Sequence, residues 1–210
     1  MPAEGLRLFV FARHAESAAN AHHVISSDPS RPVALTARGR AQARALGDQL
    51  ANLPIDLAVG TRLLRTQQTI GIALEGRPVP VLIEPGFDEL QAGDLDGAPM
   101  QTYWAWKHDH TADEPLPHGE SPNHALRRCA GALRRLLART EPVILVVLHE
   151  LALRNIISAA APGPARVPGA GFSNAVPYLF GEGAVRRAAD ALQTLTLPVG
   201  PDRLPPPPGP

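Results

Sequence analysis

Two apolar segments constrain the fold of this chain more than any other feature of its sequence. Residues 143–148, VILVVL, are apolar throughout, and residues 6–12, LRLFVFA, are apolar at all but one position. Strands that are apolar on both faces are typical of a parallel sheet with helices packed on either side. Arg13 and His14 directly follow one segment, and His149 follows the other. The sequence therefore predicts two central strands that both end at side chains capable of chemistry.

Strand and helix patterns alternate along most of the chain. Short apolar runs predict further strands over residues 56–59 and 79–83. Helices are expected after the candidate N-cap Thr36, over residues 62–74, after the cap formed by Ser121 and Pro122, and over residues 151–161. This alternation predicts an α/β fold, a three-layer sandwich with a mostly parallel central sheet and helices on both faces.

The regular pattern is lost between residues 85 and 121, where glycines, prolines and acids surround Tyr103, Trp104 and Trp106. A segment this long without a clear pattern is usually functional. We interpret it as a small cap of loop and helix, inserted after the third strand. The chain then divides into a catalytic domain over residues 1–195 and a proline-rich tail over residues 196–210, which is expected to be extended and disordered.

Composition limits the partners and the compartment. Lys plus Arg and Asp plus Glu number 20 each, so the formal net charge is zero. A neutral chain lacks the broad attraction that non-specific binding to nucleic acid or anionic membranes requires, so neither partner is expected. The single cysteine, Cys129, excludes a disulfide framework within one chain. With no signal-like amino terminus and no apolar segment of about 20 residues, the sequence indicates a cytoplasmic protein.

Two histidines and two arginines suggest a site for phosphate. His14 and His149 follow predicted parallel strands, whose carboxyl ends meet at one edge of a sheet, so we expect the two imidazoles to meet. Taken alone, either ring is more often a structural histidine held by hydrogen bonds. Arg13 and Arg65 change that balance, because both should lie at the same edge and a planar guanidinium matches phosphate oxygens.

The motif RHAES at residues 13–17, followed by Asn20, resembles the signature of the histidine phosphatase superfamily. That superfamily includes cofactor-dependent phosphoglycerate mutases and many small-molecule phosphatases. Five further segments are similar to those of the family and occur in the same order: LTARGRAQARALGDQL at 35–50, LLRTQQT at 63–69, DELQAGDLDG at 88–97, HGES at 118–121 and VVLHELALR at 146–154. The resemblance covers about residues 6–180.

The resemblance implies a role for each matching residue. His14 would be the nucleophile, with its other ring nitrogen held by a backbone carbonyl. Arg13, Arg65 and a protonated His149 would bind the phosphoryl oxygens. Glu89 would protonate the leaving group and then activate the water that cleaves the phosphohistidine. The scheme requires no cofactor and no metal.

Further residues are candidates for substrate binding. Asn20 would add a neutral hydrogen-bond donor, and Ser17 would shape the loop or make a minor phosphate contact. Trp104 and Lys107 in the cap are the remaining candidates. The aromatic cluster of the cap either anchors this segment on the core or lines a pocket for an apolar leaving group.

Three positions depart from the family pattern. Ala15 and His118 stand where glycine is common in the family, and Glu150 stands where glycine usually follows the second histidine. A carboxylate at position 150 disfavours a dianionic phosphate unless it points away or pairs with a cation. The change at Ala15 is mild and should not disable the loop. Those at His118 and Glu150 lie near the predicted pocket and affect the expected substrate range and rate more than the class of reaction.

The favoured function is that of a phosphoric monoester hydrolase acting on a small phosphorylated metabolite. A mutase needs extra cations in the cap, and Lys107 is the only fixed positive charge between residues 99 and 117.

A non-catalytic regulatory module on the same fold is a further alternative. It predicts the loss of a site histidine or arginine, and none is lost in this sequence. A metal-dependent hydrolase is the last alternative, and its candidate ligands, which lack a defined spacing, are His22, His23, Asp28, His108, Asp109 and His110. The sequence leaves open whether the chain forms a homodimer.

Overall fold

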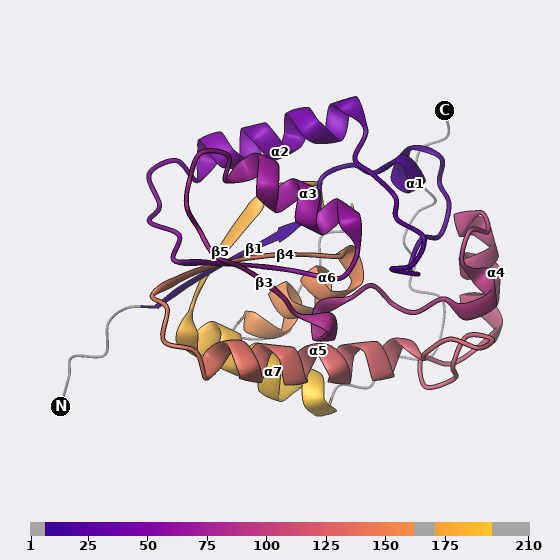
Figure 1. The fold of residues 1–210 in the computed structure, drawn as a ribbon. Helices are drawn as coiled ribbons and strands as arrows, with labels where there is room; N and C mark the ends of the chain where they lie inside the picture. Colours follow the sequence, from indigo (N-terminus) through magenta and orange to yellow (C-terminus); the bar gives the residue numbers. More distant parts are fainter. Residues whose placement is uncertain (1–6, 162–170, 195–210) are drawn as a thin grey trace.

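The computed structural model describes residues 7–161 and 171–194 and has a five-stranded sheet at its centre (Figure 1). The strand order is β3-β2-β4-β1-β5, and β5 is antiparallel to β1 while the other pairs are parallel. The strands are β1 (Leu8–Arg13), β2 (Leu57–Gly60), β3 (Val81–Ile83), β4 (Val143–Leu148) and β5 (Pro177–Gly181). The mostly parallel sheet predicted from the sequence is confirmed.

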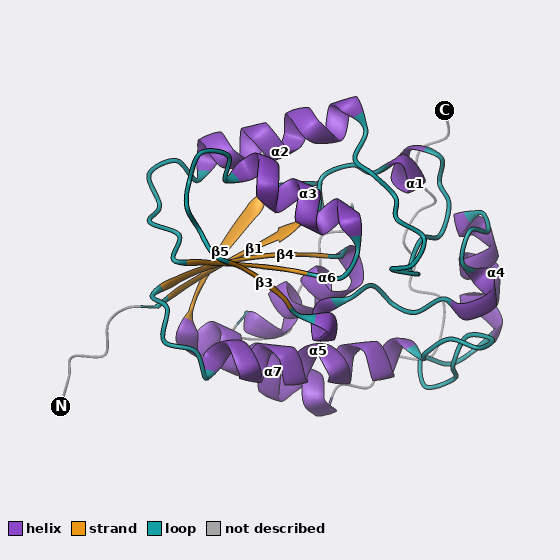
Figure 2. Cartoon of the chain, viewed as in Figure 1, coloured by secondary structure: helices purple, strands orange, loops and turns teal. Residues whose placement is uncertain are grey.

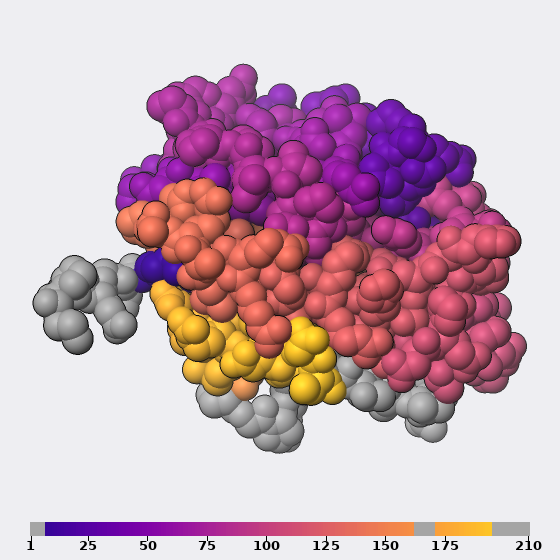
Figure 3. Space-filling view, turned by 60° about the horizontal axis from the view of Figure 1, so that its bottom comes forward, coloured from indigo at the N-terminus to yellow at the C-terminus, as the bar shows by residue number. Residues whose placement is uncertain are grey.

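Helices cover both faces of the sheet (Figure 2). One face is covered by α2 (Ala37–Gln49) and α3 (Leu64–Ala73). The other face is covered by α5 (Pro122–Leu137), α6 (Glu150–Ala160) and α7 (Glu182–Thr194). The space-filling view of this second side shows α5 and α7 at the surface and the cap at one end (Figure 3). The three-layer arrangement is therefore confirmed.

The two central strands are buried because their alternate side chains enter different cores. Val10 and Ala12 of β1 pack toward α2 and α3, whereas Phe9 and Phe11 pack toward α5, α6 and α7. Strand β4 divides in the same way, and all six of its residues are buried. This two-sided burial explains why both strands read as continuous apolar runs.

The cap contains more regular structure than the sequence pattern indicates. Two short turns of 3-10 helix, at Pro85–Phe87 and Gly93–Leu95, precede α4 (Met100–Asp109). Tyr103 and Trp106 pack against a small core of Ile25, Ala92 and Leu116, which anchors the segment. Trp104 faces solvent, with 41% of its surface exposed.

Gly93 is required where the cap approaches its own backbone. It has a positive φ of 55°, and a Cβ there would lie 2.0 Å from the carbonyl oxygen of Pro117. His118 also adopts a positive φ, of 52°, so it occupies the kind of backbone conformation that glycine favours. Its ring is exposed and lies 2.8 Å from Asp94.

Strand β5 and helix α7 are not among the predicted elements. Strand β5 begins with Pro177 and is only partly buried, as expected of a strand at the edge of a sheet. Helix α7 buries Val185, Ala188, Ala189 and Leu192 along one face, so the spacing of these apolar residues is a signal from which the helix could have been predicted. The predicted tail over residues 196–210 lies outside the described residues. Within the described part of the chain, no helix has both the length and the apolar character needed to span a membrane.

Candidate active site

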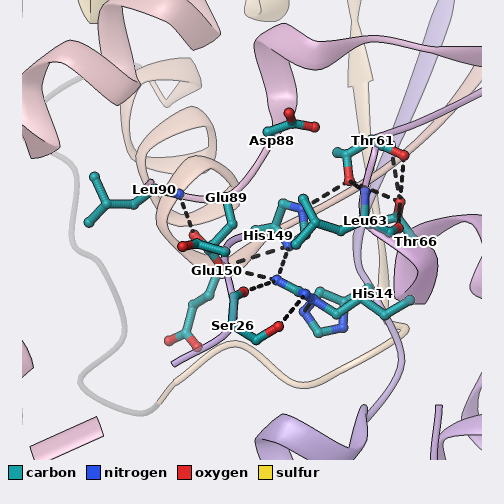
Figure 4. Close-up of polar contacts among 12 residues, drawn as sticks. His14, Ser26, Thr61, Leu63, Thr66, Asp88, Glu89, Leu90, His149 and Glu150 are labelled. Atoms are coloured by element: carbon teal, nitrogen blue, oxygen red, sulfur yellow. Dashed lines mark hydrogen bonds and ion pairs between the residues drawn. The ribbon is translucent and has the colours of Figure 1, made fainter. Parts of the chain in front are cut away.

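The two histidines that follow the central strands lie side by side, because β1 and β4 are parallel neighbours. The backbone nitrogen of His14 donates to the carbonyl of Leu148 at 2.9 Å, so β1 and β4 end at the same level of the sheet. The ring centroids of His14 and His149 are 5.2 Å apart. Both residues are buried, with 2% and 0% of their surface exposed. The carboxyl edge of the sheet therefore carries a pair of facing imidazoles (Figure 4).

The contacts of His14 define its tautomer. Its Nδ1 lies 2.8 Å from the carbonyl oxygen of Ala15, which can only accept, so Nδ1 carries the proton. Arg65 donates from Nε to His14 Nε2 at 3.0 Å, so Nε2 holds the lone pair. Burial, followed by the charges of Arg65 and Arg13, holds the pKa of His14 well below its ordinary value. His14 is therefore a neutral imidazole with an available nitrogen lone pair.

His149 has the opposite tautomer. Its Nδ1 accepts from Arg65 Nη2 at 3.2 Å, and its Nε2 donates to Thr61 Oγ1 at 3.1 Å. Thr61 follows β2, so a third parallel strand also ends at this site. Burial and the charge of Arg65 hold the pKa of His149 well below its ordinary value. The ring is neutral in this structure, where the resemblance implies a protonated one.

Arg65 links the two imidazoles. It lies in the first turn of α3, is 4% exposed, and contacts both rings. Its remaining donors bind Ser26, at 3.3 Å to the hydroxyl and 3.0 Å to the carbonyl oxygen. A ligand with several oxygens can replace Ser26 as an acceptor, so the guanidinium suits a phosphoryl group.

The carboxylate of Glu89 lies at the edge of this cluster. Its Oε2 is 3.7 Å from Nδ1 of His149 and 3.9 Å from Nη2 of Arg65, and its Oε1 accepts from the backbone of Leu90 at 3.0 Å. Burial raises the pKa of Glu89 more than the nearby arginines lower it. A carboxyl group that stays protonated to higher pH is suited to donate a proton.

Two arginines hold the loop that carries Glu89. Arg128 of α5 donates to the carbonyl oxygens of Asp88 and Glu89 and also binds the carboxylate of Glu120. Asp88 accepts from the backbone and side chain of Arg62, at 2.9 and 2.6 Å. The Asp88 carboxylate is thus engaged in holding the loop, which leaves Glu89 as the carboxylate facing the histidines.

Arg13 lies at the site but is already paired. Its Nη1 is 2.8 Å from Oε2 of Glu150 and donates to the carbonyl of Phe172 at 2.9 Å. Glu150 also accepts from Arg154 at 2.9 Å. The carboxylate at position 150 is therefore paired with cations. This is one of the two arrangements in which a carboxylate here does not disfavour a dianionic phosphate.

The predicted substrate-binding residues are placed less uniformly. Ser17 is the N-cap of the short helix α1 (Ala18–Ala21), is 1% exposed, and donates to Asn20 Oδ1 at 3.0 Å. This pair shapes the loop after β1 and leaves only the Nδ2 group of Asn20 to donate to a ligand. Trp104 and Lys107 lie on α4, at the outer edge of the molecule in Figure 1, with Nζ of Lys107 5.6 Å from the Trp104 ring. Their roles as substrate contacts stay predictions.

Several supporting residues are absent from the sequence predictions. Thr69 accepts from the backbone of Ala15 at 3.0 Å, and Asn174 donates to the carbonyl of His14 at 2.7 Å. Together with Ser26, Thr61 and Arg128 they hold the loops of the site. Thr69 belongs to the LLRTQQT motif, so its place after Arg65 is a usable signal. Asn174 and Ser26 lie in loops with no pattern of their own.

Metal ligands do not gather in the described part of the chain. His108 lies 2.9 Å from Asp109, and His110 stacks on Trp106 with ring centroids 4.5 Å apart. Among residues 7–161 and 171–194, no three His, Cys, Asp or Glu side chains approach closely enough to hold a metal ion.

Comparisons with known proteins identify the family of the chain. The family model of the histidine phosphatase superfamily (branch 1) matches residues 9–174. The adenosylcobalamin/alpha-ribazole phosphatase of Salmonella typhimurium is 31% identical over 169 residues, covering 76% of this chain and 82% of that protein. A probable phosphoglycerate mutase of Serratia proteamaculans is 32% identical over 161 residues, covering 73% and 74%.

Solved structures show the same fold. The alpha-ribazole phosphatase of Shigella flexneri aligns with a TM-score of 0.66 and 26% identity, covering 82% of this chain and 89% of that one. YhfR of Bacillus stearothermophilus aligns with a TM-score of 0.71 at 20% identity, covering 82% and 90%. With these likenesses and a family model that spans most of the sequence, the chain belongs to the histidine phosphatase superfamily.

Proposed function

We propose that this chain is a phosphomonoesterase that hydrolyses a small phosphorylated metabolite through a phosphohistidine on His14. One observation carries the proposal: the unprotonated Nε2 of a buried, neutral His14 lies 3.0 Å from Arg65 Nε. The lone pair that would attack phosphorus and a cation that would bind the phosphoryl oxygens are thus adjacent.

In the first step, His14 Nε2 forms a bond to phosphorus as the bond from phosphorus to the ester oxygen breaks. Arg65, Arg13 and His149 bind the non-bridging oxygens, and the anion favours protonation of His149. The proton on His14 Nδ1 stays bound to the carbonyl of Ala15. Glu89 transfers its proton to the leaving oxygen, which departs as an alcohol.

In the second step, water replaces the alcohol beside Glu89. The Glu89 carboxylate takes a proton from this water as its oxygen bonds to phosphorus and the bond from nitrogen to phosphorus breaks. Inorganic phosphate leaves, and His14 Nε2 and the protonated Glu89 are restored. One carboxyl group therefore serves as acid and then as base.

Hydrolysis is favoured over mutase activity by the charges of the cap. A mutase must bind the carboxylate of glycerate as well as its phosphate, and the segment from 99 to 117 holds a single fixed positive charge, Lys107. Similarity to a probable phosphoglycerate mutase makes mutase activity the second candidate. The two predict different products, inorganic phosphate or a transferred phosphoryl group.

The proposal is tested by measuring phosphate release from a panel of phosphate monoesters. We expect release by the unmodified chain, no change on adding a metal chelator, and no release by His14→Ala. His118→Ala is a matched control. The sequence predicts an effect of His118 on the rate, but its ring is exposed and pairs with Asp94, so this variant should leave the rate unchanged. Full activity in His14→Ala, or no release from any ester, would contradict the proposal.

A further inference from the structure

Glu150 lies directly beside the site without a part in the proposed chemistry. It is the first residue of α6 and follows His149 in the sequence. Its two carboxylate oxygens bind different arginines, Oε2 to Arg13 at 2.8 Å and Oε1 to Arg154 at 2.9 Å. About 30% of the Glu150 side chain is exposed, against 17% and 18% for the arginines. The carboxylate is thus a partly buried bridge between two guanidinium groups.

This bridge fixes the orientation of Arg13. Its Nη1 is held from two directions, by Glu150 and by the carbonyl of Phe172. Its Nε is buried and has no acceptor within the described part of the chain. Glu150 therefore sets which edge of the Arg13 guanidinium remains for a phosphoryl oxygen.

Glu150 also reduces the positive charge that a ligand meets. Arg13 and Arg65 are the guanidinium groups that act on both histidines, and Glu150 offsets one of them. Arg62, near the loop of Glu89, is bound by Asp88 at 2.6 Å. The negative charge of Glu150 reaches Glu89 as well, where it helps to raise the pKa of that carboxyl group. The site can balance one phosphoryl group, but a second anionic group beside Arg13 would meet the negative charge of Glu150.

We infer that Glu150 is a positioning and specificity-determining residue, which holds Arg13 and selects phosphate monoesters whose alcohol carries no second anionic group. The inference rests on the proposed function and names its substrate class. The bridge between Arg13 and Arg154 is the observation that carries it.

Glycerol 3-phosphate and 3-phosphoglycerate form a suitable pair of probes. They share a three-carbon skeleton and a phosphate, and they differ by a hydroxymethyl group in one and a carboxylate in the other. We expect the unmodified chain to favour glycerol 3-phosphate in kcat/KM. Glu150→Gln should reduce this preference about tenfold, mainly through a lower KM for 3-phosphoglycerate, since a nearby like charge is removed.

The chain offers a matched control for this variant. Glu182 is the first residue of α7 and bridges Arg7 and Arg186 in the same way, at the opposite end of β1. Glu182→Gln removes an equivalent charge and should leave the preference unchanged. Glu150→Asp keeps the charge and should retain the preference even where the shorter side chain lowers the rate. An unchanged preference in Glu150→Gln would overturn the inference.

A binding measurement separates this inference from the proposed function. Calorimetric titration of both esters into His14→Ala, with and without Glu150→Gln, reports selection without turnover. We expect the same tenfold change in the ratio of the two Kd values. Equal ratios in the two proteins, or binding of neither ester, would overturn the inference. Hydrolysis failing while the ratio of Kd values changes would overturn only the proposed function.

Discussion

The two ends of β1 carry the same set of residues and use it differently. At the carboxyl end, Glu150 bridges Arg13 of the strand and Arg154 of α6. At the amino end, Glu182 bridges Arg7, next to the strand, and Arg186 of α7. In both places a glutamate begins a helix and pairs with an arginine four residues later. The residue types and their spacing cannot by themselves distinguish the two ends.

The surroundings distinguish them. Arg7 donates to the carbonyl oxygens of Leu136 and Leu137 at 3.1 and 3.0 Å, so it satisfies the end of α5. Arg13 lies instead beside two buried imidazoles and Arg65, where three parallel strands end. Because parallel strands all end at one edge, side chains from distant parts of the sequence meet only there. The polarity of the sheet, more than the local motif, makes one end a site.

The largest expected effect contrasts Arg65 with Arg7. Arg65→Gln removes the cation that contacts both histidines and should lower kcat/KM about a thousandfold, the loss typical of a group that stabilises a transition state. Arg7→Gln should leave kcat/KM unchanged. Steady-state kinetics with an aryl phosphate checks both, and similar losses in the two variants would remove the distinction between the ends.

The next effect contrasts a glutamate of the site, Glu89, with Glu182 at the amino end of β1. Glu89→Gln removes the proton donor and should slow alkyl phosphates about a hundredfold, but aryl phosphates much less, because their leaving groups need no proton. Glu182→Gln should slow neither. Equal slowing of alkyl and aryl esters in Glu89→Gln would exclude Glu89 as the general acid.

Part of the site can be predicted from the sequence alone. The two strands, their histidines and the place of Arg65 follow from apolar runs and from the order of elements. The neutral state of His149 does not, because it depends on Arg65 and Thr61, which come from α3 and the end of β2. The pairing of Glu150 with Arg13 likewise depends on where β1 and α6 meet.

Some parts of the fold also could not be predicted from the sequence, for physical reasons. Helix α4 has no fully buried residue, so it lacks the apolar stripe that identifies α5. Strand β5 is a partly exposed edge strand that begins at a proline. Arg128 holds the Glu89 loop through backbone carbonyls, and a sequence does not show which carbonyls lie within reach.

A third prediction concerns stability at low pH. His14 and His149 have pKa values below the ordinary value of about 6.5 in the folded chain. As the pH falls, the unfolded chain therefore binds protons at these two positions at a higher pH than the folded chain does. The free energy of unfolding should therefore fall as the pH drops below 6.5, by up to ~1.4 kcal/mol per pH unit for each histidine. Urea unfolding between pH 8 and pH 5 measures this slope.

His14→Gln should reduce that slope, and His118→Gln, which removes an exposed ring, should not. This result would place the pH dependence at the carboxyl end of β1. An identical slope in all three proteins would show that the paired imidazoles do not control it.

The smallest effect is expected at the amino end. Arg7→Gln should lower the free energy of unfolding by about 1 to 2 kcal/mol, because two carbonyls at the end of α5 lose a charged donor. Glu182→Gln should cost less than about 1 kcal/mol, as is usual for a partly exposed ion pair. Denaturant titration checks both, and a larger loss in Glu182→Gln would reverse the order.

The most direct test of the account is to identify the atom that becomes phosphorylated. The chain would be mixed briefly with an excess of an aryl phosphate and quenched in alkali, where phosphohistidine is retained. Peptide mapping would then locate the phosphoryl group, and nuclear magnetic resonance of the nitrogen-labelled protein would identify the ring nitrogen. We expect a phosphoryl group on Nε2 of His14. Phosphorylation of His149, or of His14 at Nδ1, would contradict it.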